Sequence, residues 1–320
     1  MANRVDILLA AYNGSPFLAE QIASIRAQTY RNWRLLISDD GSSDGTLDVA
    51  RSAGDDDMRI QVLPRHKPFG SARMHFMHLL ALSDAPYVML CDQDDVWLPH
   101  KIEAMLDCMR KIESQDPEVP VLVFCDLEVV DDKLKRISPS FWSFTGLDSK
   151  RTAVSDLLVR NPVTGCASMM NAALVKLARA THAKSYMIMH DWWLALLAAS
   201  FGKLVGIDDQ LVQYRQHGAN EAGAVEDRLL NKLGNLAFSR RLAVSSVRQA
   251  VSFLEIYGND MPNDVREIVS AYARLPQCGV FRRIAVVNRY GFWKRGLPSA
   301  LFQAAVLLRL KANMKACISV

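Results

Sequence analysis

Three carboxylates crowd into four positions after a short apolar run, in the segment Asp92-Gln93-Asp94-Asp95. Like charges this close repel one another, which is costly unless a cation or a solvated turn relieves the repulsion. Oxygen ligands of this kind suit Mg²⁺ or Mn²⁺, which bind through one or two carboxylates together with substrate phosphates. The alternative is structural, because Asp94 or Asp95 could cap the helix that follows. The residues alone leave both interpretations open.

A second polar segment, residues 39–46 with the sequence DDGSSDGT, begins with Asp39 and Asp40. A carboxylate at a strand end can accept hydrogen bonds from a base or ribose, but the segment also fits a turn with a helix cap. Residues 10–16, AAYNGSP, lack the GxGxxG pattern and argue against a Rossmann dehydrogenase. The chain also lacks a GxxxxGK[ST] segment, which excludes a P-loop NTPase.

Both acidic segments follow predicted strands, in a pattern where short β-rich runs alternate with helical ones. Strands are expected at Val5–Ala11, Trp33–Ser38, Arg59–Leu63, Tyr87–Cys91 and Val119–Val130, and helices at Pro16–Gln28, from about Asp44, at Ser71–Leu82 and at 100–113. This order predicts an α/β fold with a mostly parallel sheet. Ligands of such sheets bind outside the carboxyl ends of the strands, which is where the polar residues gather.

The remainder of the chain divides into a loop-like stretch, some short elements and a helical end. Residues 131–150 contain Pro139 and three aromatic residues, and we expect a loop there. From about residue 224 the pattern is helical, with breaks at Gly258–Pro262, Pro276–Gly279 and Gly291–Pro298. We therefore predict an α/β domain at 1–221 and a helical, basic region at 222–320.

Three motifs in this order resemble the family-two inverting glycosyltransferases of the GT-A fold, over about residues 4–220. They are residues 10–13 after the first strand, 39–46 after the second and 92–97, DQDDVW, after the fourth. With residues 214–220, YRQHGAN, downstream, the chain is most similar to the bacterial subgroup that contains rhamnosyltransferases of cell-surface polysaccharide synthesis. The resemblance implies a nucleotide-sugar transferase.

The resemblance also implies roles for individual residues. Tyr12 would stack on the nucleotide base and Asp39 would accept from the pyrimidine N–H, although Tyr12 could equally be a core aromatic. Asp92 and Asp94 match the metal-binding DxD positions, with Asp95 contacting the sugar or supporting the turn. The other residues expected to bind the donor are Ala10, Asn13, Asp40 and Gln93 within the motifs, and Lys67 and Arg73, although charges on a surface helix are the commoner explanation for these two.

Direct displacement at the anomeric carbon needs a base for the acceptor hydroxyl, and Asp191 is the candidate. It matches the position where the family carries an acidic base, although a helix N-cap fits the sequence equally well. Further along the chain, relatives of this fold can use a downstream His or Arg at the metal or diphosphate. His217 is therefore a candidate third metal ligand, and Arg215 a candidate phosphate contact.

Charge is distributed unevenly along the 320 residues. Residues 271–320 contain nine Lys or Arg and no Asp or Glu, whereas the chain as a whole carries only +4. Aromatic residues interleave with eight of these charges. The eight are Arg282, Arg283, Arg289, Lys294, Arg295, Arg309, Lys311 and Lys315. The pattern suits a segment on anionic lipid, where a polyprenyl-linked acceptor would lie, or a helical bundle with a solvated basic face. No nucleic-acid motif accompanies the charge, so nucleic-acid binding is not expected.

Composition excludes several other classes of protein. With 50% hydrophobic and 22% charged residues, the chain is typical of packed globular proteins. Its longest uncharged run, Asn161–Val175, is shorter than the roughly 20 apolar residues of a spanning helix, and the N-terminus shows no cleavable signal. The six cysteines are scattered without a CxxC pair, so neither a disulfide framework nor a cysteine zinc site is expected. We expect a cytoplasmic protein with a peripheral contact at the inner face of the membrane.

The expected activity is transfer of a sugar, such as rhamnose from dTDP-rhamnose, onto a lipid-linked or growing cell-surface glycan. Two alternatives remain from the sequence. A nucleotidyltransferase shares the fold but usually carries a Gly-rich loop and a lysine after the first strand, which residues 10–16 do not provide. A catalytically silent nucleotide-sugar-binding scaffold would not need the carboxylates at positions 39, 92, 94 and 191.

Overall fold

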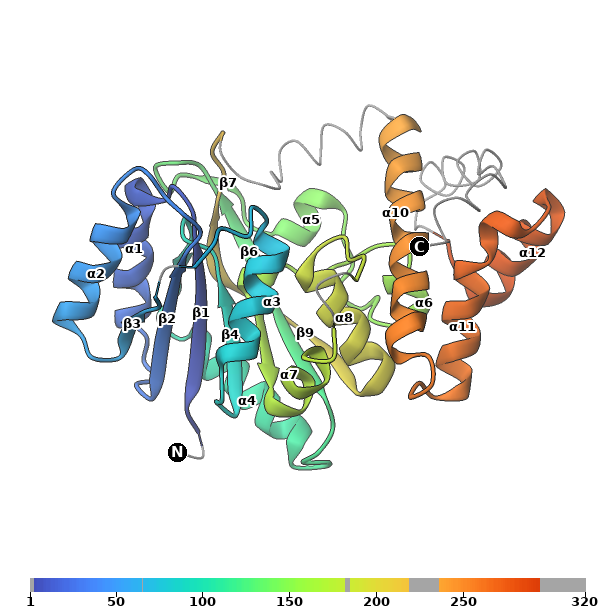
Figure 1. Ribbon diagram of the computed structural model, residues 1–320, viewed down its shortest axis with the longest axis horizontal. Coiled ribbons are helices and arrows are strands. Elements are labelled where there is room, and N and C mark those ends of the chain that lie inside the picture. The colour runs from blue at the N-terminus through green and yellow to red at the C-terminus, as the bar shows by residue number, and fades with distance from the viewer. Residues whose placement is uncertain (1–2, 65, 182–184, 219–235, 294–320) are drawn as a thin grey trace.

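A twisted, mostly parallel sheet runs through the middle of the molecule, and helices cover both of its faces (Figure 1). The computed structural model describes residues 3–64, 66–181, 185–218 and 236–293. The strands are β1 Val5–Ala11, β2 Trp33–Asp39, β3 Ile60–Val62, β4 Tyr87–Cys91, β5 Val96–Trp97, β6 Val121–Val130, β7 Arg136–Ser138, β8 Ser168–Asn171 and β9 Lys203–Arg215. The helices before the last strand are α1 Ser15–Arg26, α2 Thr46–Asp56, α3 Ala72–Leu82, α4 Lys101–Glu113, α5 Phe141–Thr145, α6 Val154–Leu157, α7 Ala172–Ala178 and α8 His190–Phe201, and those after it are α10 Leu236–Tyr257, α11 Asn263–Ala273 and α12 Val280–Tyr290.

The strand order places the carboxyl ends of the central strands at one edge. It reads β3-β2-β1-β4-β8-β6-β9-β5, with β7 paired to β6. The first four strands are parallel, β8 runs antiparallel to both of its neighbours, and β9 is parallel to β6. The chain moves outward from β1 to β3 and then returns to the other side of β1 as β4. Such a reversal leaves a crevice at the carboxyl ends of β1 and β4.

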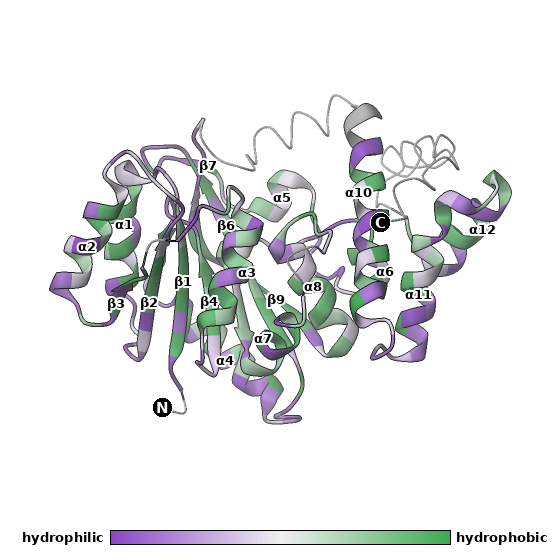
Figure 2. Cartoon of the chain, in the orientation of Figure 1, coloured by the Kyte–Doolittle hydropathy of each residue, from purple (hydrophilic) through white to green (hydrophobic). Residues whose placement is uncertain are grey.

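The central strands are hydrophobic because both of their faces are covered, as Figure 2 shows in green. All of β4 is buried, and so is β1 apart from the partly buried Ala10. The one charged residue in β1, Asp6, is fully buried and accepts from Arg34 Nη2 at 2.6 Å and from Ser83 Oγ at 2.7 Å. The strands and helices expected in the first 130 residues are confirmed, with ends that shift by a few residues.

Residues 131–150 differ from the expected loop, because they contain β7 and α5. Ser140 caps α5 by accepting from Ser143 N, and Phe141 and Trp142 at its start are buried. Trp142 N donates to Asp126 Oδ1 at 3.2 Å, and the indole donates to Pro162 O at 3.2 Å. These partners come from distant segments, so the local sequence did not reveal the helix.

The C-terminal helices break where expected, and the first of them, α10, packs against α8. Phe253 of α10 meets Trp193 edge to face with ring centroids 5.1 Å apart, and Gln249 Oε1 accepts from Ile188 N at 2.8 Å. Within the bundle Arg283 is buried and donates to the carbonyls of Leu275 and Pro276, so it does not contribute to an exposed basic face. The predicted boundary at 221 lies outside the described residues.

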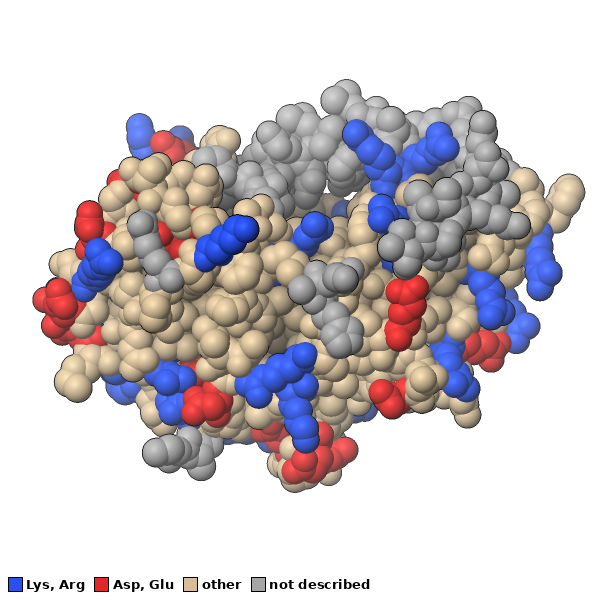
Figure 3. Space-filling view, in the orientation of Figure 1, with Lys and Arg blue, Asp and Glu red and all other residues tan. Residues whose placement is uncertain are grey.

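Lys and Arg gather at the end of the molecule formed by α10–α12, where acidic side chains are fewer (Figure 3). Lys294, Arg295, Arg309, Lys311 and Lys315 of the predicted basic tail lie outside the described residues. Within the described ranges no helix combines the length and the apolar character needed to cross a membrane.

Candidate active site

A cavity of about 660 Å³ opens at the carboxyl ends of β1, β2 and β4, where the strand order leaves the crevice. Its walls combine acidic, aromatic and backbone groups from segments far apart in the sequence. They are Ala10, Ala11, Tyr12, Asp40, Gly41, Pro68, Gly70, Ser71, Ala72, His75, Phe76, Asp92, Gln93, Asp94, Thr164, Gly165, Met189, His190, Asp191 and Tyr214. The cavity therefore brings together the three motifs and Asp191, as expected.

The three carboxylates of the acidic loop, residues 92–95, do not all face the cavity. Asp92 and Asp94 line it, whereas Asp95 is fully buried and accepts from Arg215 N at 3.1 Å. Burial, and next the charge of Asp94, raise the pKa of Asp92 well above its usual range. A cation in the cavity would relieve this repulsion, so the two lining carboxylates fit a divalent ion.

His217, the candidate third metal ligand, lies beside the acidic loop. Its Nε2 is 2.8 Å from Asp94 Oδ2, and its ring stacks on Phe17 at 4.7 Å. A second cluster, Asp92, Asp95 and Cys166, also brings ligand atoms within 4.8 Å of one another. Burial raises the pKa of the Cys166 thiol well above its ordinary value, so the sulfur keeps its proton and is a poor ligand for a hard cation.

Arg215 braces the acidic loop from outside the cavity. Its Nε donates to Asp94 O at 2.7 Å, its Nη1 to Asp132 O at 2.5 Å, and its Nη2 pairs with Glu20. The guanidinium is 2% exposed and lies 4.8 Å from the centre of the Phe17 ring. A direct contact with a phosphate would require one of these nitrogens to exchange its partner.

Gln93 and the segment after β1 hold Tyr12 at the rim of the cavity. The side chain of Tyr12 is 59% exposed, which removes the alternative of a core aromatic. Asn13 has a positive φ of 48° and accepts from Ser43 N at 3.0 Å, while its backbone N donates to Ser42 Oγ at 2.9 Å. Asn13 thus joins the first two motifs. It lies beside the cavity and does not line it.

The two carboxylates after β2 also organise loops. Asp39 accepts from the backbone N–H groups of Gly41 and Ser42 at 3.2 to 3.3 Å. Asp40 accepts from Phe69 N at 2.7 Å and Gly70 N at 2.9 Å, and it lines the cavity. The loop after β2 is therefore fastened to the loop before α3.

The two cations predicted near the donor lie beside the cavity and do not line it. Lys67 is exposed, and Arg73 Nη1 donates to Met187 O at 3.1 Å. Arg73 therefore ties α3 to the segment before α8. Both donor-binding roles stay predictions.

Asp191 is in the first turn of α8, but it is not the cap of that helix. Met189 occupies the cap position and makes no side-chain capping bond, so Asp191 is not the N-cap that the sequence also allowed. The Asp191 carboxylate accepts from Trp192 N at 2.5 Å and Asn161 Nδ2 at 3.3 Å. Burial nevertheless raises its pKa to about 7. A carboxylate of that pKa can exchange protons near neutral pH.

The sequence reading missed His190, which also lines the cavity. Its ring lies 4.4 Å from that of Phe76, and burial lowers its pKa to about 3. Among the described residues neither ring nitrogen has a hydrogen-bond partner. A Cβ on Gly165 would lie 2.6 Å from Nε2, so the ring depends on a glycine there. Its position next to Asp191 could have indicated that His190 lies in the cavity. Nothing in the sequence linked His190 to Gly165.

Residues 6–177, more than half of the chain, match the family model described as glycosyl transferase family 2. The dTDP-rhamnosyl transferase RfbG of Shigella flexneri is 26% identical over 226 residues, which cover 68% of this chain and 74% of RfbG. Two uncharacterized glycosyltransferases of Rickettsia typhi and Rickettsia prowazekii are 30% and 31% identical, but the chain spans only 38% of their length.

Solved structures share the fold. The S. aureus TarS 1–349 complex with UDP matches with a TM-score of 0.54 at 12% identity, over 92% of this chain and 93% of that one. The mannosyltransferase PcManGT from Pyrobaculum calidifontis, in complex with GDP-Man and Mn²⁺, matches with a TM-score of 0.51 at 16% identity, over 98% and 83% of the two chains. These matches confirm the expected GT-A fold class.

Proposed function

The chain belongs to glycosyl transferase family 2, and from this membership we propose that it transfers a sugar from a nucleoside-diphosphate donor to an acceptor hydroxyl, with inversion. The observation that carries the proposal is the content of one cavity. Two carboxylates suited to a cation, Asp92 and Asp94, share it with Asp191, whose raised pKa suits a base. A direct displacement needs the base within reach of the same anomeric carbon whose departing diphosphate the cation would hold.

In the proposed reaction, the Asp191 carboxylate takes the proton of the acceptor hydroxyl. The hydroxyl oxygen forms a bond to the anomeric carbon as the bond to the diphosphate breaks, and that electron pair leaves with the nucleoside diphosphate. Asp92 and Asp94, with His217 beside them, would hold Mg²⁺ or Mn²⁺. When bound, such an ion neutralises charge on the departing diphosphate.

The donor is proposed to be dTDP-rhamnose, with its base at the Tyr12 and Asp40 side of the cavity. Similarity to RfbG supports this sugar, and the exposed ring of Tyr12 offers a face for stacking. The neighbours bind UDP in TarS and GDP-Man in PcManGT, so a nucleotide is the shared part of their ligands.

The acceptor is proposed to be a lipid-linked or growing cell-surface glycan, approached at the inner face of the membrane. The described feature that supports such a contact is the start of α12, where Phe281 is 90% exposed beside the exposed Arg282. An aromatic ring and a cation on one exposed turn suit an anionic lipid surface.

Calorimetric titration with dTDP-rhamnose, UDP and GDP-mannose, with and without Mn²⁺, tests the donor site on the wild type and Asp94→Asn. We expect metal-dependent binding that favours one nucleotide. In the variant, this binding should be at least tenfold weaker. Binding without any transfer to glycan acceptors would favour the scaffold alternative. Equal binding by both proteins would remove Asp94 from the donor site.

A further inference from the structure

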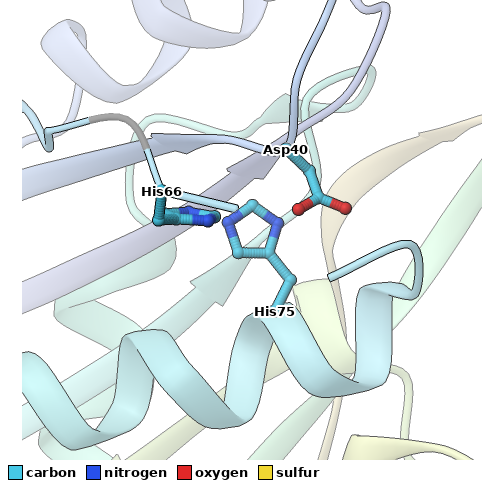
Figure 4. A group of neighbouring side chains, drawn as sticks. All are labelled: Asp40, His66 and His75. Carbon is cyan, nitrogen blue, oxygen red and sulfur yellow. The ribbon is translucent and has the colours of Figure 1, made fainter. Parts of the chain in front are cut away.

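A cluster of two imidazoles and one carboxylate lies beside the cavity, away from the acidic loop. Its residues follow β2, lie in the loop after β3 and belong to α3, and two of them, Asp40 and His75, line the cavity. Asp40, His66 and His75 each offer a ligand atom within 4.8 Å of the other two. Figure 4 shows the His75 ring between the His66 ring and the Asp40 carboxylate. None of the three belongs to the acidic loop.

With both imidazoles neutral, the hydrogen bonds of this cluster leave one ring nitrogen without a hydrogen. His66 Nδ1 is 3.0 Å from Lys67 O, and a carbonyl only accepts, so Nδ1 carries the hydrogen. In the neutral ring Nε2 is then a lone pair, which accepts the single hydrogen of Ser38 Oγ at 2.9 Å. Because that hydrogen is used, the oxygen of Ser38 acts as an acceptor toward His75 Nε2, which lies 2.7 Å away.

This arrangement leaves Nδ1 of His75 as a lone pair. Burial lowers the pKa of His75 to about 4, so a second proton is not retained at neutral pH. Figure 4 shows a ring nitrogen of His75 facing the Asp40 carboxylate. The lone pair of His75 and the carboxylate of Asp40 thus face each other in a partly buried place. A cation between them would be attracted to both.

The surroundings of the cluster are those of a metal site. Asp40 is fixed by two backbone N–H groups, and His66 donates its outer N–H to a backbone carbonyl, as metal-binding histidines commonly do. Two imidazoles with a carboxylate suit zinc and neighbouring transition ions better than Mg²⁺. Bonds of about 2.1 Å would draw the ligand atoms closer together than they now stand, with Ser38 Oγ turning away.

We propose that Asp40, His66 and His75 form a second cation site, distinct from the acidic loop, which takes a divalent transition ion of the zinc class. Asp40 and His75 also line the cavity, so the ion would join the loop after β2 to α3 at the wall of the donor site. This site does not depend on the sugar or the acceptor that the protein uses.

The test is calorimetric titration of the metal-stripped, full-length protein with Zn²⁺, and with Co²⁺ followed by visible absorption. Asp94→Asn/His217→Gln serves as the background, because it removes two of the three ligands proposed for the other metal site. One bound ion is expected there, with at least tenfold weaker binding after His66→Gln or His75→Gln is added. His100→Gln, an exposed position before α4, should leave the affinity unchanged.

Ser38→Ala separates loss of a ligand from damage to the loop, because it removes the bridging hydroxyl but no ligand atom. Zn²⁺ should bind this variant at least as tightly as the background, and circular dichroism should show all variants folded. The proposal is overturned if Zn²⁺ does not bind the background, if His66→Gln and His75→Gln bind it equally well, or if Ser38→Ala loses it as His75→Gln does.

Discussion

Gln93 and Tyr12 are joined by two hydrogen bonds that imitate a pair of strands. Gln93 Oε1 accepts from Tyr12 N at 2.8 Å, and Gln93 Nε2 donates to Tyr12 O at 2.9 Å. Gln93 of the acidic loop therefore fixes the position of the Tyr12 backbone at the rim of the cavity. This contact links the metal-binding and base-binding ends of the proposed donor site.

Gly14→Ala should break this link. A Cβ at position 14 would lie 2.1 Å from Gln93 Oε1, so the amide must leave Tyr12. We expect nucleotide binding to weaken about tenfold in calorimetry and the free energy of unfolding to fall by about 1–3 kcal/mol, as in other overpacked sites. Gly279→Ala is the control, because a Cβ there meets nothing within 4 Å. Unchanged binding by Gly14→Ala would show that the clamp is dispensable.

Asp191→Asn should lower the rate of transfer by about 10²–10⁴, the usual contribution of a general base. The amide keeps the shape and the contact with Asn161 but cannot take a proton. Donor affinity should stay within about twofold of wild type, measured by calorimetry beside a radiolabel transfer assay. Asp107→Asn, on the exposed side of α4, is the matched control. Normal transfer by Asp191→Asn would remove Asp191 from the mechanism.

The rate should rise with pH through about 7, because Asp191 must be ionised to act. Burial raises its pKa to about 7, so below that value each pH unit should cost about a tenfold loss in kcat/KM. The measurement is a pH profile of kcat/KM at fixed ionic strength. A profile that is flat from pH 5 to 8 would contradict this assignment.

The same shift predicts a trend in stability. The pKa of Asp191 is higher in the folded than in the unfolded protein, so its contribution is present below about pH 4 and is lost as the pH rises through about 7. Asp191→Asn, which carries no charge, should therefore be more stable than wild type at pH 8, and the difference should shrink towards pH 5. Urea unfolding at both pH values measures this, and an unchanged difference would disagree with a buried, raised carboxyl group.

Arg215→Lys should loosen the acidic loop, because an ammonium cannot reproduce the fork that reaches Asp94 O, Asp132 O and Glu20. We expect Mn²⁺ to bind about 10–100-fold more weakly, which is typical when a supporting residue of a metal site is changed. Arg266→Lys on the exposed side of α11 is the control. Equal Mn²⁺ affinity would show that the brace does not position the metal ligands.

Phe281→Ser/Arg282→Glu should reduce binding to vesicles that contain anionic lipid by at least about fivefold, since each basic residue near such a surface contributes about 1 kcal/mol. Substitution is preferable to removing residues 222–320, because Phe253 of α10 packs on Trp193. Sedimentation with anionic and neutral vesicles measures the effect, and Asp264→Asn is the control. Equal sedimentation of both proteins would remove α12 from membrane contact.

The sequence by itself determined the first half of the fold. Short apolar runs such as β1 and β4, bounded by polar turns, favour buried strands, and the turn after each marks the edge where a parallel sheet binds ligands. Asp92, Asp94 and Asp191 were found in this way together with the family resemblance, and the cavity contains all three. These features depend on the pattern of residue types within short, continuous segments, which the sequence gives directly.

The tertiary structure decided which side chain faces which neighbour. The guanidinium of Arg215 donates to the backbone of the acidic loop, and that of Arg283 is buried in the helical bundle. Helix α5 is held by Trp142, which donates to Asp126 and Pro162. The approach of His66 to His75 likewise depends on two loops folding over β2. Such contacts join residues far apart in the chain, and their energies depend on burial and on the direction of each hydrogen bond, which no local pattern specifies.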